Sequence, residues 1–480
     1  MINRTGKPRE ECGVFGIVNS EQSARKAYLG LYALQHRGQE SAGISTVCEG
    51  KIMTYKRLGL VSDIFNNEEI FERLPGDMAI AHNRYSTSGS TTLNNAQPLT
   101  VSFKAGMISA AHNGNLVNAG LLRKQMENDG TIFTTTSDSE VLLHLIARSK
   151  EDDLQDMIIS ALQQLQGAYS FLLLTPDALY AVRDPHGIRP LCIGKKGDEW
   201  AVSSETCAFD LLQFDYIRTV EPGELVILRK GQKPESIRPF PEVDRFAGCV
   251  FEFIYFARPD SFVFNKPVDK VRRRMGRQLA KEAPVADADA VIAVPDSSNT
   301  AALGYANELG IPFELGLIRN HYIGRTFILP KQMERDISAR IKYNPVKGIL
   351  KGKKIVVVDD SIVRGTTSKK LVSMIRDAGA REIHFRVASP EIIAPCYYGV
   401  DTPQKDKLIA ALKSNDEIAE HLQVESLKYL SIEGLKEISH LDHIGLCYAC
   451  FNEKYPVPIK GYDNLNQKKC FENKFSFEED

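Results

Sequence analysis

One stretch of this chain constrains its fold more than any other, the segment KKIVVVDDSIVRGTTSKKL at residues 353–371. Ile355–Val358 is a continuous apolar run, and a strand without polar alternation is buried on both faces, as in a parallel sheet. Asp359 and Asp360 follow directly, at the strand end where open α/β sheets bind their ligands. The sequence therefore predicts a parallel α/β domain with a ligand site at this edge.

The loop after these aspartates has the composition of a phosphate site. It contains Gly365 followed by three hydroxyl side chains, Thr366, Thr367 and Ser368, and leads into a helical stretch. Backbone N–H groups of such a loop and the helix N-terminus can bind a phosphate. Paired carboxylates beside it suit ribose hydroxyls and a hydrated Mg²⁺. An acidic strand end before an ordinary capped helix is the alternative, but the whole string favours the phosphate site.

This string resembles the ribose-phosphate signature of type I phosphoribosyltransferases. The resemblance implies one Mg²⁺ per subunit, held by Asp359, Asp360 and Ser297, the last from a second strand end, VIAVPDSSNTAALGYA. It also implies a set of residues that bind phosphoribosyl diphosphate: Asp359, Asp360, Ser361, Arg364, Gly365, Thr366, Thr367, Ser368, Arg325 and Lys342.

A basic segment lies between these two strand ends. It carries Arg319, Arg325, Lys331, Arg335, Arg340 and Lys342 in a polar context. We expect it to close over the diphosphate and exclude water while charge develops on the leaving group. A solvated charged face is the alternative for some of these side chains.

Cys12 stands where a polar leader gives way to the apolar, β-prone run CGVFGI. By residue type alone, a cysteine here is more often a small buried hydrophobe than a nucleophile. Four further strings place polar residues beside expected strand or helix ends: ALQHRGQESAGI (33–44), AHNRYSTSG (81–89), AHNGNL (111–116) and TTSDSEVLLHL (135–145). Together with ECGVFGI they resemble the glutamine-hydrolysing N-terminal-nucleophile domains, which fold as αββα sandwiches.

The resemblance implies that the leader is removed and that Cys12 becomes the terminal residue. Its free α-amine, with a pKa of about 7.7–8.0, can then take the proton of the thiol. While Glu11 is attached, that nitrogen is an amide and cannot. Cys12 is then the nucleophile, with its partners implied as follows: Asn113 and Gly114 as oxyanion-hole donors, Gly38 for close backbone approach, Arg84 for the glutamine carboxylate and Asp138 for its α-ammonium group. Ala81 and Asn83 depart from the family pattern, which has Gly and an apolar residue there.

With both sets of motifs and the string VFEFIYFARPDS at residues 250–261, the chain resembles the amidophosphoribosyltransferase family from Cys12 to about residue 460. The implied fold class is α/β (α+β), a sandwich followed by a parallel-sheet domain. The implied reaction hydrolyses glutamine at Cys12 and transfers ammonia, through a closed passage, to C1 of 5-phosphoribosyl 1-diphosphate. The products are 5-phosphoribosylamine, glutamate and diphosphate, in the first step of purine synthesis. The family also implies inhibitory purine nucleotides and a homo-oligomer, a tetramer.

We expect a division into five segments: a propeptide (1–11), a glutamine amidotransferase domain (12–231), a linker rich in proline and charge (232–248), a phosphoribosyltransferase domain with a C-terminal cysteine segment (249–460) and a tail (461–480).

Cys447 and Cys450 form a C-x-x-C pair, which alone fits zinc, redox or iron–sulfur roles. Cys249 and Cys396 complete a possible set of four thiolates. One branch of the family holds a [4Fe–4S] cluster at matching places, so the resemblance implies one cluster per subunit. A tetrahedral zinc site and unliganded buried cysteines are the alternatives.

Charge and cysteine content limit the partners and the cellular location that we expect for this chain. The net charge is -1, and no basic cluster suggests nucleic acid or a membrane surface as partner. The 9 cysteines are scattered, unlike a disulfide framework, and favour the cytoplasm. Two other functions are alternatives to the implied reaction. The chain could be another glutamine-dependent amidotransferase, or a regulator that keeps the phosphoribosyl fold without catalysis.

Overall fold

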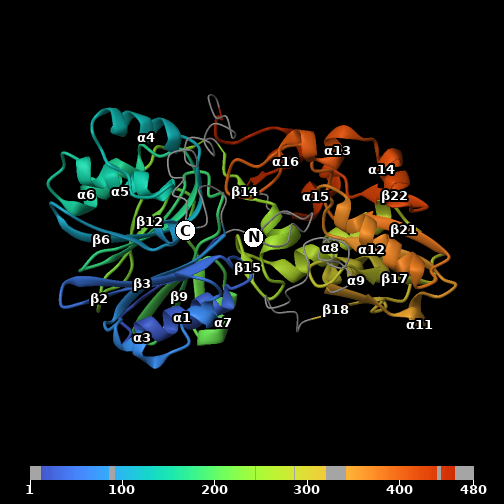
Figure 1. Cartoon of the computed structure of the whole chain (residues 1–480), viewed down its shortest axis with the longest axis horizontal. Helices are drawn as coiled ribbons and strands as arrows, with labels where there is room; N and C mark the ends of the chain where they lie inside the picture. Colours follow the sequence, from blue (N-terminus) through green and yellow to red (C-terminus); the bar gives the residue numbers. More distant parts are fainter. Residues whose placement is uncertain are drawn as a thin grey trace, which may run out of the picture.

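The computed structural model describes residues 12–85, 92–243, 245–285, 287–320, 342–439 and 445–459. The predicted propeptide and tail lie outside these residues. Two parts of the chain lie side by side, and we call residues 12–237 the first half and residues 248–459 the second half (Figure 1).

Two antiparallel sheets stacked face to face form the centre of the first half. One sheet has the order β11 (Asp215–Thr219), β9 (Cys192–Lys196), β10 (Glu199–Ser203), β1 (Gly13–Val18), β4 (Met78–Arg84), β2 (Ser41–Cys48) and β3 (Lys51–Leu58). The other has the order β13 (Glu235–Ile237), β12 (Leu225–Leu228), β8 (Leu179–Arg183), β7 (Gly167–Leu174), β6 (Gly106–Leu116) and β5 (Leu99–Phe103). Strand β13 falls inside the predicted linker, so the second sheet extends into that segment.

Helices cover both outer faces of this pair of sheets (Figure 1). The first sheet is covered by α1 (Ser23–Ala33), α2 (Val61–Ile64), α3 (Glu68–Glu72) and α7 (Cys207–Leu212). The second is covered by α4 (Ala119–Asn128), α5 (Ser139–Arg148) and α6 (Leu154–Leu162), and a short 3₁₀ turn, η1 (Leu93–Asn95), precedes β5. The expected αββα sandwich is confirmed.

The second half is built on a parallel sheet, as its apolar strands predict. The order is β17 (Ala290–Ala293), β20 (Lys354–Asp359), β21 (Glu382–Val387) and β22 (Ser426–Tyr429). One face packs against α11 (Lys347–Leu350), α12 (Thr366–Asp377), α13 (Ile409–Leu412) and α14 (Asn415–Leu422). The other face packs against α8 (Val268–Glu282), α9 (Asn299–Leu309), the π-helix η2 (Glu252–Phe256), α15 (Ile432–Ser439) and α16 (Ala449–Asn452).

Short elements complete the second half. They are the parallel pair β14 (Gly248–Cys249) and β23 (Leu446–Cys447), the antiparallel pairs β15 (Phe262–Val263) with β16 (Lys266–Pro267) and β18 (Leu317–Arg319) with β19 (Tyr343–Pro345), and the 3₁₀ turn η3 (Lys405–Lys407).

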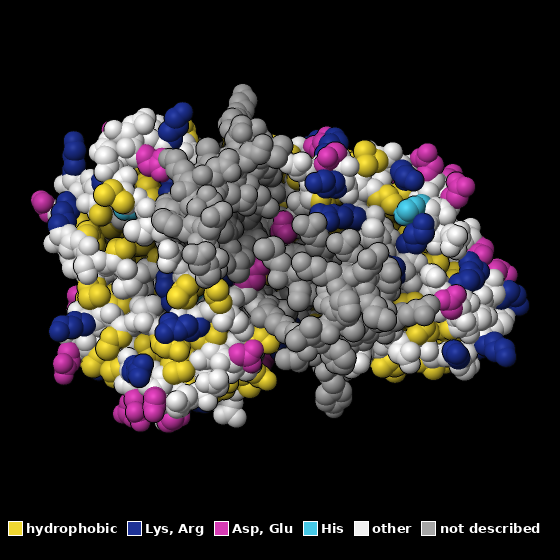
Figure 2. Space-filling view, viewed as in Figure 1, with side chains coloured by type: hydrophobic (Ala, Val, Ile, Leu, Met, Phe, Trp, Pro, Cys, Tyr) yellow, Lys and Arg dark blue, Asp and Glu magenta, His cyan; other side chains and the backbone are white. Residues whose placement is uncertain are grey.

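Basic and acidic side chains are interspersed over the described part of the face in Figure 2. This arrangement agrees with the small net charge of -1. Within the described ranges, no helix is long and apolar enough to cross a bilayer.

Helices α8 and α9 cross closely because glycines stand at their contact. A Cβ at Gly276 would lie 1.8 Å from the carbonyl oxygen of Ala301. We expect Gly276→Ala to lower the free energy of unfolding by about 1–3 kcal/mol, because the helices must move apart. Equilibrium urea denaturation measures this. The control is Gly348→Ala, where a Cβ meets no atom within 4 Å, and an equal loss of stability there would contradict the explanation.

Candidate functional site

Cys12 lies at the beginning of β1, beside the end of β4. Gly13 pairs with Asn83 in the antiparallel register, which brings Cys12 next to Arg84. The thiol donates a hydrogen bond to the carbonyl oxygen of Tyr85, with 3.5 Å between Sγ and O. Burial raises the pKa of the Cys12 thiol to about 11, and the charge of Arg84 opposes this shift. The thiol is therefore protonated at neutral pH and needs a base before it can act as a nucleophile.

Two opposite charges share the surroundings of this thiol. Arg84 is buried and interacts electrostatically with Cys12 and Asp138. Burial alone would raise the pKa of Asp138, but His112 and a hydrogen bond from the Leu116 N–H hold it below its usual value. A fixed guanidinium and a fixed carboxylate near the same thiol match the carboxylate and ammonium groups of a free amino acid.

Asn113 and Gly114 lie near the end of β6, on the facing sheet. The Asn113 Nδ2 donates to the Ser204 hydroxyl at 3.4 Å, and its Oδ1 has no hydrogen-bond partner within the described ranges. Gly114 has a φ of 148°, and a Cβ there would lie 2.0 Å from the carbonyl oxygen of Ala168. Only glycine fits this backbone position.

The segment after α1 approaches β4 closely. A Cβ at Gly38 would lie 2.6 Å from the carbonyl carbon of Asn83, so the backbones touch there. The Asn83 side chain accepts from the Gly13 N–H at 2.8 Å and donates to the Leu34 carbonyl at 2.6 Å. The residue that departs from the family pattern thus fastens the strand of Cys12 to the end of α1.

The second site lies at the carboxyl edge of the parallel sheet. Ala293 and Val358 are neighbours in the β17–β20 register, so the residues that follow them meet. The Ser297 hydroxyl donates to Asp360 Oδ2 at 2.5 Å, and the Ser361 hydroxyl donates to Asp360 Oδ1 at 2.7 Å. Ser298 donates to Asp359 Oδ1 at 3.2 Å. The structure therefore brings together the three residues predicted to hold Mg²⁺.

The predicted phosphate loop leads into a helix, as expected. Gly365 has a φ of 74° and is the N-cap of α12, so Thr366–Ser368 form its first turn with their N–H groups facing the loop. A Cβ at Gly365 would lie 2.8 Å from Ile409 Cδ1. Ser361 and Arg364 lie in the segment between β20 and α12.

The basic segment is only partly described. Arg319 donates from Nη1 to Asp296 Oδ2 at 2.7 Å. The Lys342 carbonyl accepts from the Asn320 N–H at 2.9 Å, which closes the base of the segment. Arg325, Lys331, Arg335 and Arg340 lie outside the described residues, and their predicted role stays a prediction.

Four free cysteines line one cavity beside Arg189: Cys249, Cys396, Cys447 and Cys450. Cys249 and Cys447 are direct partners in the β14–β23 pair. Burial raises the pKa of Cys450, and the other three thiols add to that shift. The Cys396 sulfur accepts from the Tyr398 N–H at 3.3 Å, a bond that also suits a thiolate.

Four thiol groups around one cavity are a donor set for a [4Fe–4S] cluster as well as for a single tetrahedral zinc. Among the described residues, no three His, Cys, Asp or Glu side chains are arranged as the ligands of one metal ion. A [4Fe–4S] cluster distributes four thiolates over four irons, so its ligands lie farther apart than those of one tetrahedral zinc.

Sequence reasoning missed a buried charge network near Cys12. Arg37 donates to both Glu205 and Glu252, and all three side chains are fully buried. These carboxylates raise the pKa of Arg37 in spite of its burial. The available signal was Glu252, the only charged residue in the apolar run CVFEFIYFA. A buried charge requires a partner.

Comparisons with known proteins agree with this two-site architecture. Residues 82–210 match a glutamine amidotransferase domain family, and residues 273–423 match a phosphoribosyl transferase domain family. Amidophosphoribosyltransferase 2, chloroplastic, from Arabidopsis thaliana is 52% identical over 454 residues, which cover 94% of this chain and 80% of the relative.

Two solved structures are also similar. One, described as the allosteric regulatory enzyme of purine biosynthesis, is 47% identical, with a TM-score of 0.89, over 93% of this chain and 97% of its own. Another, the glutamine phosphoribosylpyrophosphate amidotransferase of B. subtilis complexed with ADP and GMP, is 46% identical, with a TM-score of 0.88, over 93% and 98% of the two chains. This chain therefore belongs to the amidophosphoribosyltransferase family.

Proposed function

We propose that the first half hydrolyses glutamine at Cys12 and that the second half transfers the ammonia to C1 of 5-phosphoribosyl 1-diphosphate. The products are glutamate, diphosphate and 5-phosphoribosylamine, in the first step of purine synthesis. The observation that carries this proposal is the thiol of Cys12 beside the opposite charges of Arg84 and Asp138, in one chain with the Asp359–Asp360 strand end.

The glutamine half-reaction begins with the proton on the Cys12 sulfur. We propose that cleavage after Glu11 frees the α-amine of Cys12, which takes this proton as the sulfur attacks the amide carbon of glutamine. Asn113 Nδ2 and the Gly114 N–H donate to the developing oxyanion. The amine then returns the proton to the leaving nitrogen as ammonia departs. Water hydrolyses the remaining thioester to glutamate.

Substrate orientation in this half comes from fixed charges. Arg84 binds the glutamine carboxylate and Asp138 its ammonium group, so the side-chain amide points toward the sulfur. Gly38 lets the backbone approach the nucleophile closely. Because the pKa of Asp138 lies below its usual value, its side chain is a charged carboxylate at neutral pH and can bind the ammonium group.

In the second half, Asp359 and Asp360 contact the ribose hydroxyls. Ser361, Arg364 and the Gly365–Ser368 turn bind the 5′-phosphate, and Arg325 and Lys342 bind the diphosphate. A Mg²⁺ held with the help of Ser297 and the two aspartates would neutralise charge on the departing diphosphate. Ammonia attacks C1 as the C1–O bond to diphosphate breaks. A closed passage keeps the ammonia from bulk water.

We also propose that Cys249, Cys396, Cys447 and Cys450 hold one [4Fe–4S] cluster per subunit. The cluster would join the 248–249 junction to the C-terminal segment, since neither half-reaction moves electrons. We expect anaerobically purified protein to be brown with about four irons per chain. Cys396→Ser should lose the colour and most of the iron, while Cys48→Ser should keep both. Colourless, iron-free protein that is fully active would contradict the proposal of a cluster.

Purine nucleotides are the proposed inhibitors, on the support of the relative complexed with ADP and GMP. A homo-oligomer, a tetramer, and a cytoplasmic location complete the proposal.

One assay tests the proposed function. The chain is given glutamine, phosphoribosyl diphosphate and Mg²⁺, and glutamate and diphosphate are both measured. We expect the two products in equal amounts. Glutamate without diphosphate would indicate another glutamine-dependent amidotransferase, and neither product would indicate a regulator without catalysis.

A further inference from the structure

We infer that the second half holds the glutamine site in its active geometry at two points, so that Glu252 and Gly399 are positioning residues for glutamine hydrolysis. This inference rests on the proposed function. Neither residue lies in the segment that matches the glutamine amidotransferase family, residues 82–210. One contact acts on the nucleophile residue, and the other acts on the oxyanion-hole strand.

The first contact passes through Arg37. Its Nε donates to the carbonyl of Cys12 at 3.4 Å. Its two terminal nitrogens donate to Glu252 Oε2 at 3.0 Å and Oε1 at 2.7 Å. A bidentate pair fixes the orientation as well as the place of a guanidinium. Glu252, together with Glu205 on the same guanidinium, therefore fixes how Arg37 presents Nε to the backbone of the nucleophile.

The peptide bond after Cys12 is held on both sides. Arg37 binds its carbonyl, and the Asn83 side chain accepts from its N–H, on Gly13, at 2.8 Å. Rotation of this peptide would turn the Cys12 backbone and displace its nitrogen and sulfur together relative to the proposed oxyanion-hole residues Asn113 and Gly114. Because that nitrogen is the proposed base, the peptide orientation bears on catalysis directly.

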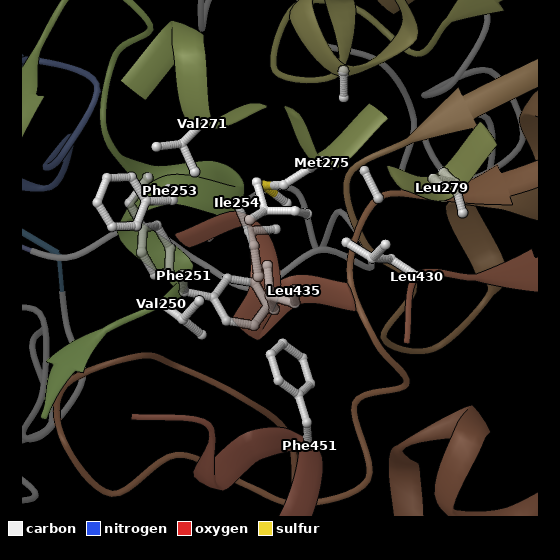
Figure 3. Close-up of a cluster of buried hydrophobic side chains, with 14 of the residues drawn as sticks. Val250, Phe251, Phe253, Ile254, Val271, Met275, Leu279, Leu430, Leu435 and Phe451 are labelled. Atoms are coloured by element: carbon white, nitrogen blue, oxygen red, sulfur yellow. The ribbon is translucent and has the colours of Figure 1, made fainter. Parts of the chain in front are cut away.

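Glu252 is itself fixed by the second half. It begins η2, whose neighbours Phe251, Phe253 and Ile254 pack in a buried apolar cluster with Val271 and Met275 of α8 (Figure 3). The buried Arg272 of α8 donates to the carbonyls of Phe253 at 2.7 Å and Ala257 at 2.8 Å. The backbone of Glu252 therefore takes its position from α8, and its carboxylate meets Arg37 and Arg189 of the first half.

The second contact is made by the backbone around Gly399. A Cβ at Gly399 would lie 3.1 Å from the carbonyl carbon and 3.2 Å from the Cα of Gly114. The next residue on the oxyanion strand, Asn115, donates from Nδ2 to the carbonyl of Tyr397 at 2.9 Å. The 397–399 segment thus packs directly behind the proposed oxyanion-hole glycine.

Arg189 joins the two contacts. Its Nε donates to the Tyr398 carbonyl at 2.9 Å, and its Nη1 lies 3.4 Å from Glu252 Oε1. Arg189 is fully buried. A buried, charge-assisted network therefore runs from the backbone of Cys12 to the segment behind Gly114. Charge-assisted and bidentate hydrogen bonds of this kind fix the orientation of the groups that they join.

These contacts concern catalysis more than substrate affinity. They reach the nucleophile and the oxyanion donors, whose relative placement determines the rate, and a misplacement of about 1 Å can cost about 100-fold. Asp138 takes its position from the first half, through the Leu116 N–H at 2.9 Å. We therefore expect the glutamine affinity to survive when the two contacts are weakened.

The test uses two variants of the full chain. Glu252→Gln removes the negative charge that pairs with Arg37 but keeps the side-chain shape, and Gly399→Ala places a methyl group against Gly114. We expect kcat for glutamine hydrolysis to fall about 10- to 100-fold, with KM for glutamine within about threefold. Phosphoribosylamine formation from free ammonia should stay within about twofold of the unaltered chain.

Matched controls separate positioning from general damage. Asp260→Asn removes an exposed carboxylate at the same junction, where it pairs with Arg258 at 2.6 Å. Gly106→Ala adds a methyl group at a φ of 113°, close to the 110° of Gly399, with no atom within 4 Å. Both controls should leave both activities unchanged.

The outcomes are distinct. Unchanged kcat with glutamine in Gly399→Ala and Glu252→Gln would overturn the inference, as would a parallel loss of the glutamine and ammonia activities. If Glu252→Gln does not fold, the result for Gly399→Ala tests the inference, because this variant keeps every buried charge in place. An unaltered chain that forms phosphoribosylamine from ammonia but hydrolyses no glutamine would refute the proposed function, and with it this inference.

Discussion

Replacement of Cys12 by alanine is expected to abolish the use of glutamine and to leave the use of free ammonia intact. The thiol is the only group proposed to form a bond with the amide carbon, so its loss should lower glutamine-dependent activity by at least about 1,000-fold. Ammonia reaches the second site without Cys12, because Asp359 and Asp360 stand on a separate sheet edge. Diphosphate release with each nitrogen donor measures both activities.

The matched control is Cys48→Ala, which replaces a free, half-buried cysteine at the end of β2. It should keep both activities. Loss of both activities in Cys12→Ala would show that the two sites are not separate, and retention of glutamine use would show that another group is the nucleophile.

Replacement of Asp360 by asparagine is expected to remove phosphoribosyl transfer from both nitrogen donors. Asp360 accepts from Ser297 and Ser361 and stands where the ribose hydroxyls and Mg²⁺ are proposed to bind. Asparagine keeps the shape but removes the charge, so we expect a loss of about 100- to 1,000-fold in diphosphate release.

The control for this variant is Asp287→Asn, which alters an exposed carboxylate that pairs with Lys354 at 2.8 Å, at the amino-terminal end of β20. It should be neutral. Loss of glutamine-dependent transfer alone in Asp360→Asn, with normal use of ammonia, would contradict the assignment of Asp360 to the phosphoribosyl site.

The parts of the fold that depend on local pattern could be predicted from the sequence. The apolar run Ile355–Val358 predicts a strand buried on both faces, and β20 spans Lys354–Asp359. The resemblance to type I phosphoribosyltransferases predicts Ser297 and Asp360 at one Mg²⁺ site, and the two side chains are hydrogen-bonded at the edge where carboxyl ends of neighbouring parallel strands meet. The string TTSDSEVLLHL, expected to place polar residues beside a strand or helix end, leads into α5, which begins at Ser139 directly after Asp138.

The contacts between the halves could not be predicted in the same way. Arg37 and Glu252 are 215 positions apart, and Asn115 and Tyr397 are 282 apart. An acid within an apolar run indicates that a buried partner exists, but the sequence does not say which arginine it is. Gly399 likewise gives no sign that its missing Cβ faces Gly114. Such pairings depend on the docking of two folded halves, which no local pattern encodes.

The terminal residue of the active enzyme tests the central claim most directly. The intact mass of purified protein should correspond to a chain that begins at Cys12, with a free amine available as the base for its own thiol. Glutamine hydrolysis should rise in proportion to the fraction of chains that begin there. A fully glutamine-active protein whose mass shows Glu11 still attached to Cys12 would contradict the account.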